Sequence, residues 1–269
     1  MSQPILIIGA GRMGGALLRG WARHKLSPVI AVDTAPSPEL TAFAKKHHIA
    51  LFKNTSSIAS LRARACVVAL KPQILKTEID ALAPIAQSGA LMLSIAAGTG
   101  IKSMKAAWGR EARIVRAMPN TPGAIGRGIT ALYADGNATR ADLGLAGKLL
   151  AALGETVWVD READIDAVTA VSGSGPAYVF LMVEALADAA AAEGLPRPLA
   201  EKLARATITG AGALLDADSA TPESLRRAVT SPKGTTEAAL KVLMRSPGLD
   251  ALMRRAVAAA RARARELGS

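Results

Sequence analysis

Cysteine, histidine and aromatic residues are all scarce in this chain of 269 residues. The single cysteine, Cys66, cannot form an internal disulfide or a thiolate zinc cluster, so we expect no metal centre and a reducing compartment. Three Trp, two Tyr and three Phe leave the core to be built from Ala, Leu, Val and Ile. The histidines are His24, His47 and His48, so the second half of the chain offers no histidine for acid–base catalysis.

The sequence also shows neither a signal-peptide pattern nor a long apolar run. Charged and glycine-rich residues arrive by position 12, and no apolar run approaches the ~18 residues typical of a membrane span. Half of the residues are hydrophobic and 20% are charged, which excludes a disordered chain. We expect a soluble cytoplasmic protein of two domains that does not bind a membrane.

Positive charge is in excess, with 33 Lys and Arg against 22 Asp and Glu. Near the C-terminus, Arg261, Arg263 and Arg265 alternate with alanine, which spreads them around a helix instead of along one stripe. Few aromatic residues are available for base stacking, and no zinc or RNP-type motif is present. The charge therefore predicts a solvated helix face and an attraction for small anions, with no nucleic-acid partner.

Strand-like and helix-like segments alternate in the first part of the chain. Short apolar runs typical of strands occupy 5–8, 29–32, 65–70, 91–95, 113–116, 129–133 and 155–159. After Glu162 the sequence is alanine-rich and helical, with Pro or Gly at each break. The pattern predicts an α/β protein, with a doubly wound Rossmann-type sheet in residues 1–161 and an all-helical domain in residues 162–269.

A glycine-rich turn follows the first strand and opens a helix. In the motif Gly9-x-Gly11-x-x-Gly14, Gly9 permits a tight turn, Gly11 lets the backbone approach a pyrophosphate, and Gly14 allows close helix–strand packing. The N-terminus of the helix supplies N–H donors and the positive end of its dipole. This context predicts dinucleotide binding.

An acidic residue, Asp33, closes the second strand. A carboxylate there accepts hydrogen bonds from the adenosine ribose diol and repels a 2′-phosphate. No Arg or Lys occurs between Asp33 and Phe43 to hold such a phosphate. Asp33 therefore favours NADH over NADPH, and the alternative is an exposed carboxylate that caps a turn.

A loop rich in hydroxyl residues, 229–237, separates two helical stretches. A glycine beside hydroxyl side chains at a helix start presents free N–H and O–H donors, which suit a small carboxylate. A capping box that ends at Glu237 explains the same pattern equally well.

Several segments, in this order and spacing, resemble the pyrroline-5-carboxylate reductase family over essentially the whole chain. The segments are Ile8-Gly9-Ala10-Gly11-Arg12-Met13-Gly14, Leu70-Lys71-Pro72-Gln73, Met118-Pro119-Asn120-Thr121-Pro122, 170–178 and 229–236. The resemblance implies reduction of the cyclic imine to L-proline by hydride from NAD(P)H. It also implies a helical C-terminal dimerisation domain, and hence a homodimer or a larger assembly of dimers.

The resemblance also assigns the site residues. Together with Asp33, the cofactor contacts fall on Gly9, Ala10, Gly11, Arg12, Met13, Asn54, Ala69, Leu70, Lys71, Pro72, Ala96 and Ala97. The substrate contacts fall on Ser231, Gly234, Thr235 and Thr236. The hydroxyl of Thr236 is the catalytic candidate, because it can orient the imine nitrogen or relay a proton to it.

Three positions depart from the family pattern. Asp33 stands where many members carry a small polar residue, which argues against their usual NADPH preference. Lys233 replaces a common glycine in the substrate loop, and Ala228 replaces a polar residue of some members. Neither of these two removes a group that the chemistry requires.

Two other functions are compatible with parts of this sequence. β-Hydroxyacid dehydrogenases share the two-domain plan, but Val179 stands at the position of their catalytic lysine and cannot do acid–base work. A non-catalytic NAD-binding sensor is the alternative from another class, and turnover of a cyclic imine separates it from an enzyme.

Overall fold

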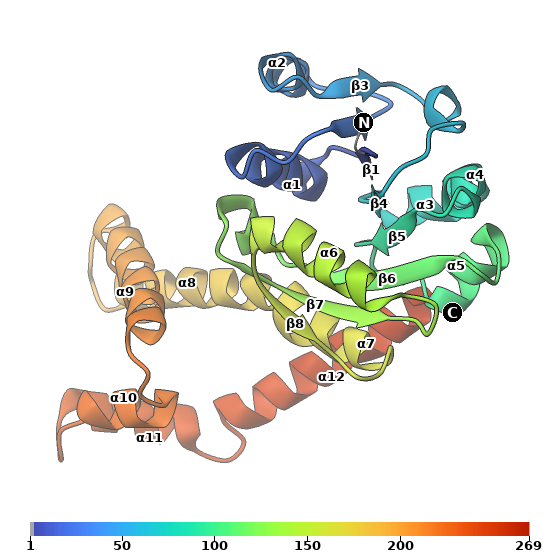
Figure 1. Cartoon of the computed structure of the whole chain (residues 1–269). Helices are drawn as coiled ribbons and strands as arrows, with labels where there is room; N and C mark the ends of the chain where they lie inside the picture. The colour runs from blue at the N-terminus through green and yellow to red at the C-terminus, as the bar shows by residue number, and fades with distance from the viewer. Residues whose placement is uncertain (1–2, 269) are drawn as a thin grey trace. The chain divides into compact units, whose positions relative to one another are not determined.

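The structure, a computed structural model, describes residues 3–268. Its strands are β1 Ile5–Ile8, β2 Val29–Val32, β3 Ala50–Phe52, β4 Ala65–Val68, β5 Leu91–Ser94, β6 Arg113–Met118, β7 Gly128–Ala134 and β8 Gly154–Trp158 (Figure 1). Its helices are α1 Arg12–Arg23, α2 Pro38–Lys46, α3 Pro72–Glu78, α4 Ala83–Gln87, α5 Ile101–Trp108, α6 Arg140–Leu150, α7 Asp164–Val168, α8 Gly175–Ala192, α9 Arg197–Ala217, α10 Pro222–Ala228, α11 Thr235–Met244 and α12 Leu249–Gly268.

All eight strands belong to one sheet in the order β3-β2-β1-β4-β5-β6-β7-β8. Neighbouring strands are parallel except β6 and β7, which are antiparallel because only a short loop joins them. Side chains of β1 alternate between two cores: Ile5 and Ile7 pack on the face covered by α1 and α6, and Leu6 and Ile8 on the face covered by α3 to α5. The predicted doubly wound sheet is confirmed.

Two tryptophans anchor the helices on the two faces. Trp21 of α1 donates its indole N–H to the carbonyl of Leu149 at 2.8 Å, and Trp108 of α5 donates to the carbonyl of Ile79 at 2.8 Å. Both rings are buried, so each indole nitrogen needs the partner that it finds.

One strand escaped the sequence analysis. β3 is only three residues long, lies at the edge of the sheet and is partly exposed, so its composition carries no buried-strand pattern. The predicted strands are all present, and the largest shifts extend β6 to Met118 and end β4 at Val68.

The chain divides into two compact units. One runs to Gly173 and takes in the chain again from Ala260, and the other is Ser174–Ala259. The first unit contains the whole sheet, and the second is helical throughout. In the helical unit, α8 and α9 pack against each other across a turn at Gly194, whose φ of +91° suits glycine.

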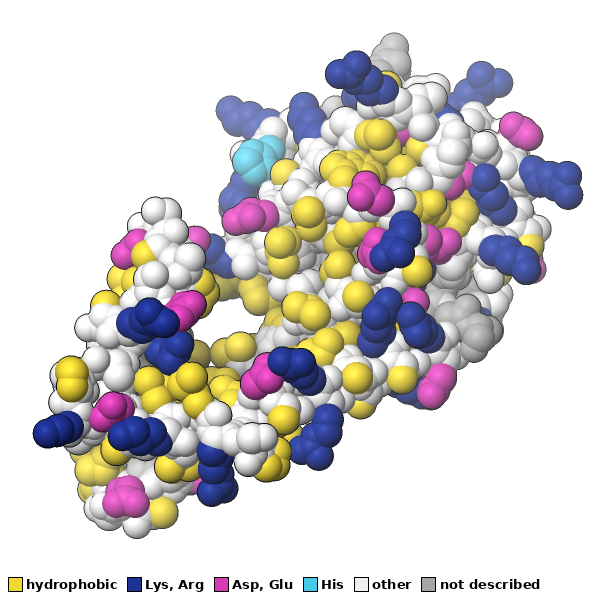
Figure 2. Space-filling model, turned by 90° about the horizontal axis from the view of Figure 1, so that it is seen from below, with side chains coloured by type: hydrophobic (Ala, Val, Ile, Leu, Met, Phe, Trp, Pro, Cys, Tyr) yellow, Lys and Arg dark blue, Asp and Glu magenta, His cyan; other side chains and the backbone are white. Residues whose placement is uncertain are grey.

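The helical unit leaves much of its apolar surface uncovered. Phe180 is 59% and Leu181 63% exposed, and hydrophobic side chains are visible on the lower left in Figure 2. The stretch Asp164–Ala192 is also long and apolar enough, by length and composition alone, to cross a membrane. No uninterrupted apolar run marks this stretch in the sequence, so it was not predicted from the sequence. A helix that packs on a second subunit has the same composition.

Candidate active site

The turn between β1 and α1 is built on glycine. Gly9 has a φ of +89°, and a Cβ on it would lie 2.8 Å from the carbonyl oxygen of Ala69. A Cβ on Gly14 would lie 2.0 Å from the carbonyl oxygen of Gly9. Gly11 is the N-cap of α1 and no side chain caps this helix, so its first N–H groups remain available to a phosphate. The turn therefore fits the pyrophosphate of a dinucleotide.

The carboxylate of Asp33 holds the same turn. Its Oδ2 accepts a hydrogen bond from the N–H of Ala10 at 2.8 Å, and its Oδ1 accepts one from the N–H of Ala35 at 3.0 Å. Asp33 thus caps a turn, as the alternative interpretation supposed. Each oxygen still has a lone pair that can accept a ribose hydroxyl, so this bonding is compatible with a coenzyme role.

A first cavity of about 420 Å³, called the Asn54 cavity, lies beside the turn. Its lining includes the predicted cofactor residues Gly9, Gly11, Asp33, Asn54, Ala69, Leu70 and Lys71. The side-chain oxygen of Asn54 accepts hydrogen bonds from Ser56 and Ser57, including one of 2.6 Å from the Ser57 hydroxyl. Because these bonds orient the amide, its NH₂ group is left to donate to a ligand.

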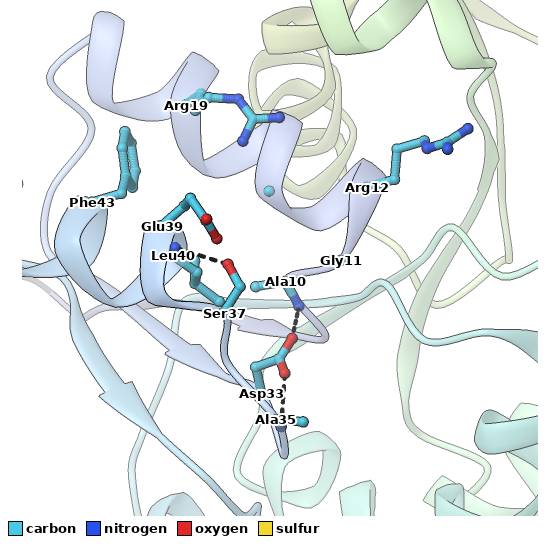
Figure 3. A pocket seen from close by; sticks show the side chains of 11 residues that line it. Ala10, Gly11, Arg12, Arg19, Asp33, Ala35, Ser37, Glu39, Leu40 and Phe43 are labelled. Atoms are coloured by element: carbon cyan, nitrogen blue, oxygen red, sulfur yellow. Dashed lines mark hydrogen bonds between the residues drawn. The ribbon is translucent and has the colours of Figure 1, made fainter.

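A second cavity of about 460 Å³, called the Arg19 cavity, adjoins the first at Gly11 and Asp33. It is lined by the predicted residues Ala10, Gly11, Arg12 and Asp33 together with Gly15, Arg19, Ala35, Ser37, Glu39, Leu40 and Phe43 (Figure 3). Arg19 and Glu39 were not predicted from the sequence, because they lie outside the family motifs. The helical spacing of Arg12 and Arg19, two turns apart, was the available signal.

The charges of the Arg19 cavity differ in their bonding. A hydrogen bond from the Ser37 hydroxyl, and then one from its own backbone N–H, hold the pKa of Glu39 below its ordinary value. Ser37 itself caps α2 by accepting a hydrogen bond from the N–H of Leu40 at 3.2 Å. The two arginines, in contrast, form no ion pair with any residue in 3–268.

Four predicted cofactor residues lie outside both cavities. Met13 packs against the core, Ala96 is buried at 3% exposure, and Pro72 begins α3. Ala97 follows Ala96 in the loop after β5. These assignments remain predictions.

An ion network missed by the sequence analysis holds this loop after β5. Arg116 on β6 is 6% exposed, and its guanidinium lies 3.1 Å from Glu162 and 3.5 Å from Asp166. The same oxygen of Glu162 accepts the N–H of Ile101, at the start of α5, at 2.8 Å. Arg116 thereby ties the carboxyl end of β6 to the segment that leads into the helical unit. Sequence spacing gives no sign of a contact between residues so far apart.

The predicted substrate loop is open at the start of α11. The N-cap is Gly234, and no side chain caps the helix. Glu237 accepts the N–H of Lys233 at 2.9 Å, so the alternative interpretation of this loop, a Thr-x-x-Glu capping box, does not hold. Lys233 has a φ of +59°, which explains why glycine suits this position.

Three hydroxyl side chains of this loop have no protein partner among the described residues, whereas the Thr230 hydroxyl donates to the carbonyl of Arg226 at 2.6 Å. Within the part of the chain that the structure describes, no hydrogen bond is formed by the side chains of Ser231, Thr235 and Thr236, nor by the N–H groups of residues 235–237. Thr236 is half-buried, whereas Ser231 and Thr235 are exposed. The loop therefore presents a set of donors with no acceptor, as a bound carboxylate requires.

The thiol of Cys66 is not available as a nucleophile or a ligand. It is fully buried in β4, and burial raises the pKa of its thiol to about 12. Among residues 3–268, no group of three His, Cys, Asp or Glu side chains is arranged to hold a metal ion.

The doubly wound sheet, the glycine turn and the acid at the end of β2 define a dinucleotide-dependent oxidoreductase. Residues 4–98 match the family model described as NADP oxidoreductase coenzyme F420-dependent, and residues 162–267 match pyrroline-5-carboxylate reductase dimerisation. The pyrroline-5-carboxylate reductase of Pseudomonas aeruginosa is 40% identical over 99% of this chain and 98% of its own. The chain belongs to the pyrroline-5-carboxylate reductase family, and it reduces pyrroline-5-carboxylate to proline.

Solved structures agree with this identification. A pyrroline-5-carboxylate reductase from Coxiella burnetii is 34% identical, with a TM-score of 0.90 over 100% of both chains. The Plasmodium falciparum pyrroline carboxylate reductase with NADP bound is 27% identical, with a TM-score of 0.84 over 99% of this chain and 98% of that one. The predicted family, fold class, enzyme activity and NAD(P)H coenzyme are confirmed, and the dimerisation family supports the predicted oligomer.

Proposed function

We propose that the start of α11 holds the carboxylate of pyrroline-5-carboxylate, and that Thr236 serves the imine nitrogen of the same ring. The observation that carries this proposal is the set of unpartnered hydroxyl and N–H groups at Ser231, Thr235 and Thr236. A carboxylate there accepts several of them at once, and the positive end of the helix dipole adds to its stabilisation. Holding the carboxylate fixes the orientation of the ring.

The chemistry needs little more from the protein. Bound NAD(P)H supplies a hydride, which adds to the carbon of the C=N bond. The imine nitrogen carries a proton at that moment and becomes the secondary amine of proline, so atoms and charge balance without a nucleophile or a strong base. The Thr236 hydroxyl is suited to orient this N–H or to relay the proton. This accounts for a second half of the chain without histidine.

A substrate without the carboxylate tests whether the donors at the start of α11 bind that group. 1-Pyrroline, the same ring without that group, should show a far higher KM than pyrroline-5-carboxylate with wild-type protein. Ser231→Ala should reduce the ratio of the two KM values, because one of the groups that bind the carboxylate is removed. An unchanged KM ratio in folded Ser231→Ala protein contradicts the role of Ser231.

We also propose that Asp33 makes the enzyme prefer NADH to NADPH. Support comes from its carboxylate at the border of both cavities, where it offers lone pairs to ribose hydroxyls and negative charge to a 2′-phosphate. Asp33→Asn removes the charge and keeps an acceptor of the same length for the Ala10 N–H, whereas Asp33→Ser removes the charge and leaves a shorter hydroxyl. Each should raise kcat/KM for NADPH relative to NADH by about ten-fold, equivalent to ~1.4 kcal/mol. A ratio equal to that of wild type would leave Asp33 as a turn cap only.

The oligomeric state, the location and the absence of other partners complete the proposal. We propose a cytoplasmic homodimer or assembly of dimers, with no nucleic-acid or membrane partner. The absence of a nucleic-acid or membrane partner is supported by basic residues of α12 that are already paired: Arg254 lies 2.9 Å from Asp250, and Arg263 lies 2.7 Å from Glu266. Light scattering with and without oligonucleotides or anionic vesicles tests the assembly and both absences.

A further inference from the structure

The guanidinium of Arg19 lies in a cavity that also contains two carboxylates, yet it forms no ion pair within residues 3–268. Both carboxylates on its wall already accept hydrogen bonds: Asp33 from the N–H groups of Ala10 and Ala35, and Glu39 from Ser37. Arg19 has no such partner within residues 3–268. An anion that enters the cavity therefore meets a guanidinium whose donors are all available.

Arg19 packs over Gly15, which lies one turn earlier on α1 and has no side chain. Its guanidinium nitrogen lies 3.4 Å from the point where a Cβ on Gly15 would stand. Because residues four apart lie above one another on a helix, the guanidinium of Arg19 occupies the space that Gly15 leaves free. Figure 3 shows Arg19 on α1 and Ser37 and Glu39 across from it at the start of α2.

The neighbourhood identifies the anion. Asp33 borders both cavities, and the Asn54 cavity contains most of the predicted coenzyme residues. A ribose that bonds to Asp33 through its diol carries any 2′-substituent next to that carboxylate. The adjoining Arg19 cavity has room for such a substituent and supplies the opposite charge.

We propose that Arg19 receives the 2′-phosphate of NADPH and so allows this chain to use NADPH in spite of Asp33. This inference rests on the proposed contact between Asp33 and the ribose. A guanidinium forms short, charge-assisted and frequently bidentate hydrogen bonds with phosphate. Coenzyme choice is then the balance of two opposed residues, in which Asp33 repels the phosphate and Arg19 attracts it.

The test compares three single variants with both coenzymes. Arg19→Gln should raise KM for NADPH about ten-fold more than KM for NADH. Arg23→Gln is the matched control, because Arg23 is exposed on the next turn of α1 and does not line the cavity. Glu39→Gln should act in the opposite direction and improve NADPH relative to NADH a few-fold, because it removes the negative charge that faces the phosphate.

Competitive inhibitors give a readout that does not depend on turnover with NADPH. 2′,5′-ADP carries a phosphate on the 2′-oxygen of its ribose, whereas ADP has phosphate at the 5′ position only. The inhibition constant of 2′,5′-ADP against NADH should rise about ten-fold in Arg19→Gln, whereas that of ADP should change less than two-fold. An equal rise for both would show that Arg19 contacts the pyrophosphate side and would overturn the proposal.

The two proposals fail in different ways. An unchanged NADPH-to-NADH ratio in Arg19→Gln protein that melts like wild type overturns the role of Arg19. An unchanged ratio in Asp33→Asn overturns the role of Asp33 and leaves the Arg19 result to stand by itself. If both roles are correct, Asp33→Asn should raise the preference for NADPH over NADH less in Arg19→Gln protein than in wild-type protein.

Discussion

The two compact units differ in where their apolar side chains go. In the sheet unit, Leu6, Ile7 and Leu93 are wholly buried between the helices of the same unit. In the helical unit, Ala187, Ala200 and Ala204 are the buried apolar residues among 174–259, while Phe180 and many other large apolar side chains are exposed. The sheet unit folds around a core of its own, whereas the helical unit depends on another subunit to cover its helices.

Breaking the subunit contact should have the largest effect. Phe180→Asp places a charge on the exposed apolar face of α8, and burying that charge against a second subunit is costly. We expect the assembly to dissociate to monomers and imine reduction to be lost, while the sheet unit keeps its fold. Light scattering and activity measured at the same protein concentration check both effects.

A conservative variant at the same position sharpens this result. Phe180→Leu keeps an apolar side chain and should retain the wild-type assembly, although with lower stability. A Phe180→Asp protein that stays dimeric and active would show that α8 is a free surface, and the comparison between the two units would lose its explanation.

The second prediction concerns the interior of the sheet unit. Gly14→Ala inserts a methyl group where the carbonyl of Gly9 stands, so the β1–α1 turn must open. Overpacking of this kind costs about 1–3 kcal/mol, and we expect a lower melting temperature together with weaker NADH binding. Gly11→Ala is the matched variant, because no atom lies within 4 Å of its added Cβ. It should retain the melting temperature of wild type and lose only coenzyme affinity.

Equal loss of stability in the two glycine variants would contradict this account of the turn. A stable Gly14→Ala protein that binds NADH normally would do the same, since it would mean that the turn has room to shift. Calorimetry and NADH titration on both proteins separate these outcomes.

The same contrast explains how far the sequence predicts the fold. The strands of the sheet unit follow from local patterns, because a buried parallel strand is apolar at every position, as at Val67 and Val68. β3 lacks that pattern because it lies at the sheet edge. The helices of the second unit are also predictable, but their packing is not, since much of what covers them lies outside this chain.

The site divides along similar lines. The glycine turn and Asp33 are predictable because their roles depend on residues close to the motif. The placement of Arg19 and Glu162 is not, because Arg19 lines its cavity only when α1 faces α2, and Glu162 meets Arg116 only when the segment before α7 approaches β6. The free donors of the α11 start were suggested by composition, but the choice between a capping box and an open loop needed the conformation of Lys233.

The third prediction tests the reacting end of the helical unit. Thr236→Ala removes the hydroxyl proposed to orient or relay the proton of the imine nitrogen, and a positioned proton donor typically contributes ~10²–10⁴-fold. We expect kcat to fall at least ten-fold, with NADH affinity and melting temperature close to wild type, because Gly234 and not Thr236 is the N-cap of α11.

Thr236→Ser, which keeps the hydroxyl, should recover most of this activity. If Thr236→Ala instead raises KM and leaves kcat unchanged, the hydroxyl only holds the ring and relays no proton. Steady-state kinetics on both variants, with imine and coenzyme varied separately, distinguish the two roles.

The smallest effect is expected at Lys233, where the substrate loop takes a left-handed conformation. A side chain at a φ of +59° costs about 1–2 kcal/mol relative to glycine, and the extra freedom of glycine in the unfolded chain offsets roughly 0.5–1 kcal/mol of that. Lys233→Gly should therefore gain at most about 1.5 kcal/mol and raise the melting temperature by a few degrees. Lys233→Ala removes the same charge but keeps the strain, so it should not stabilise the protein. Equal stabilisation by the two variants would assign the effect to charge, and would mean that the loop at the start of α11 is shaped by its surroundings and not by its own backbone.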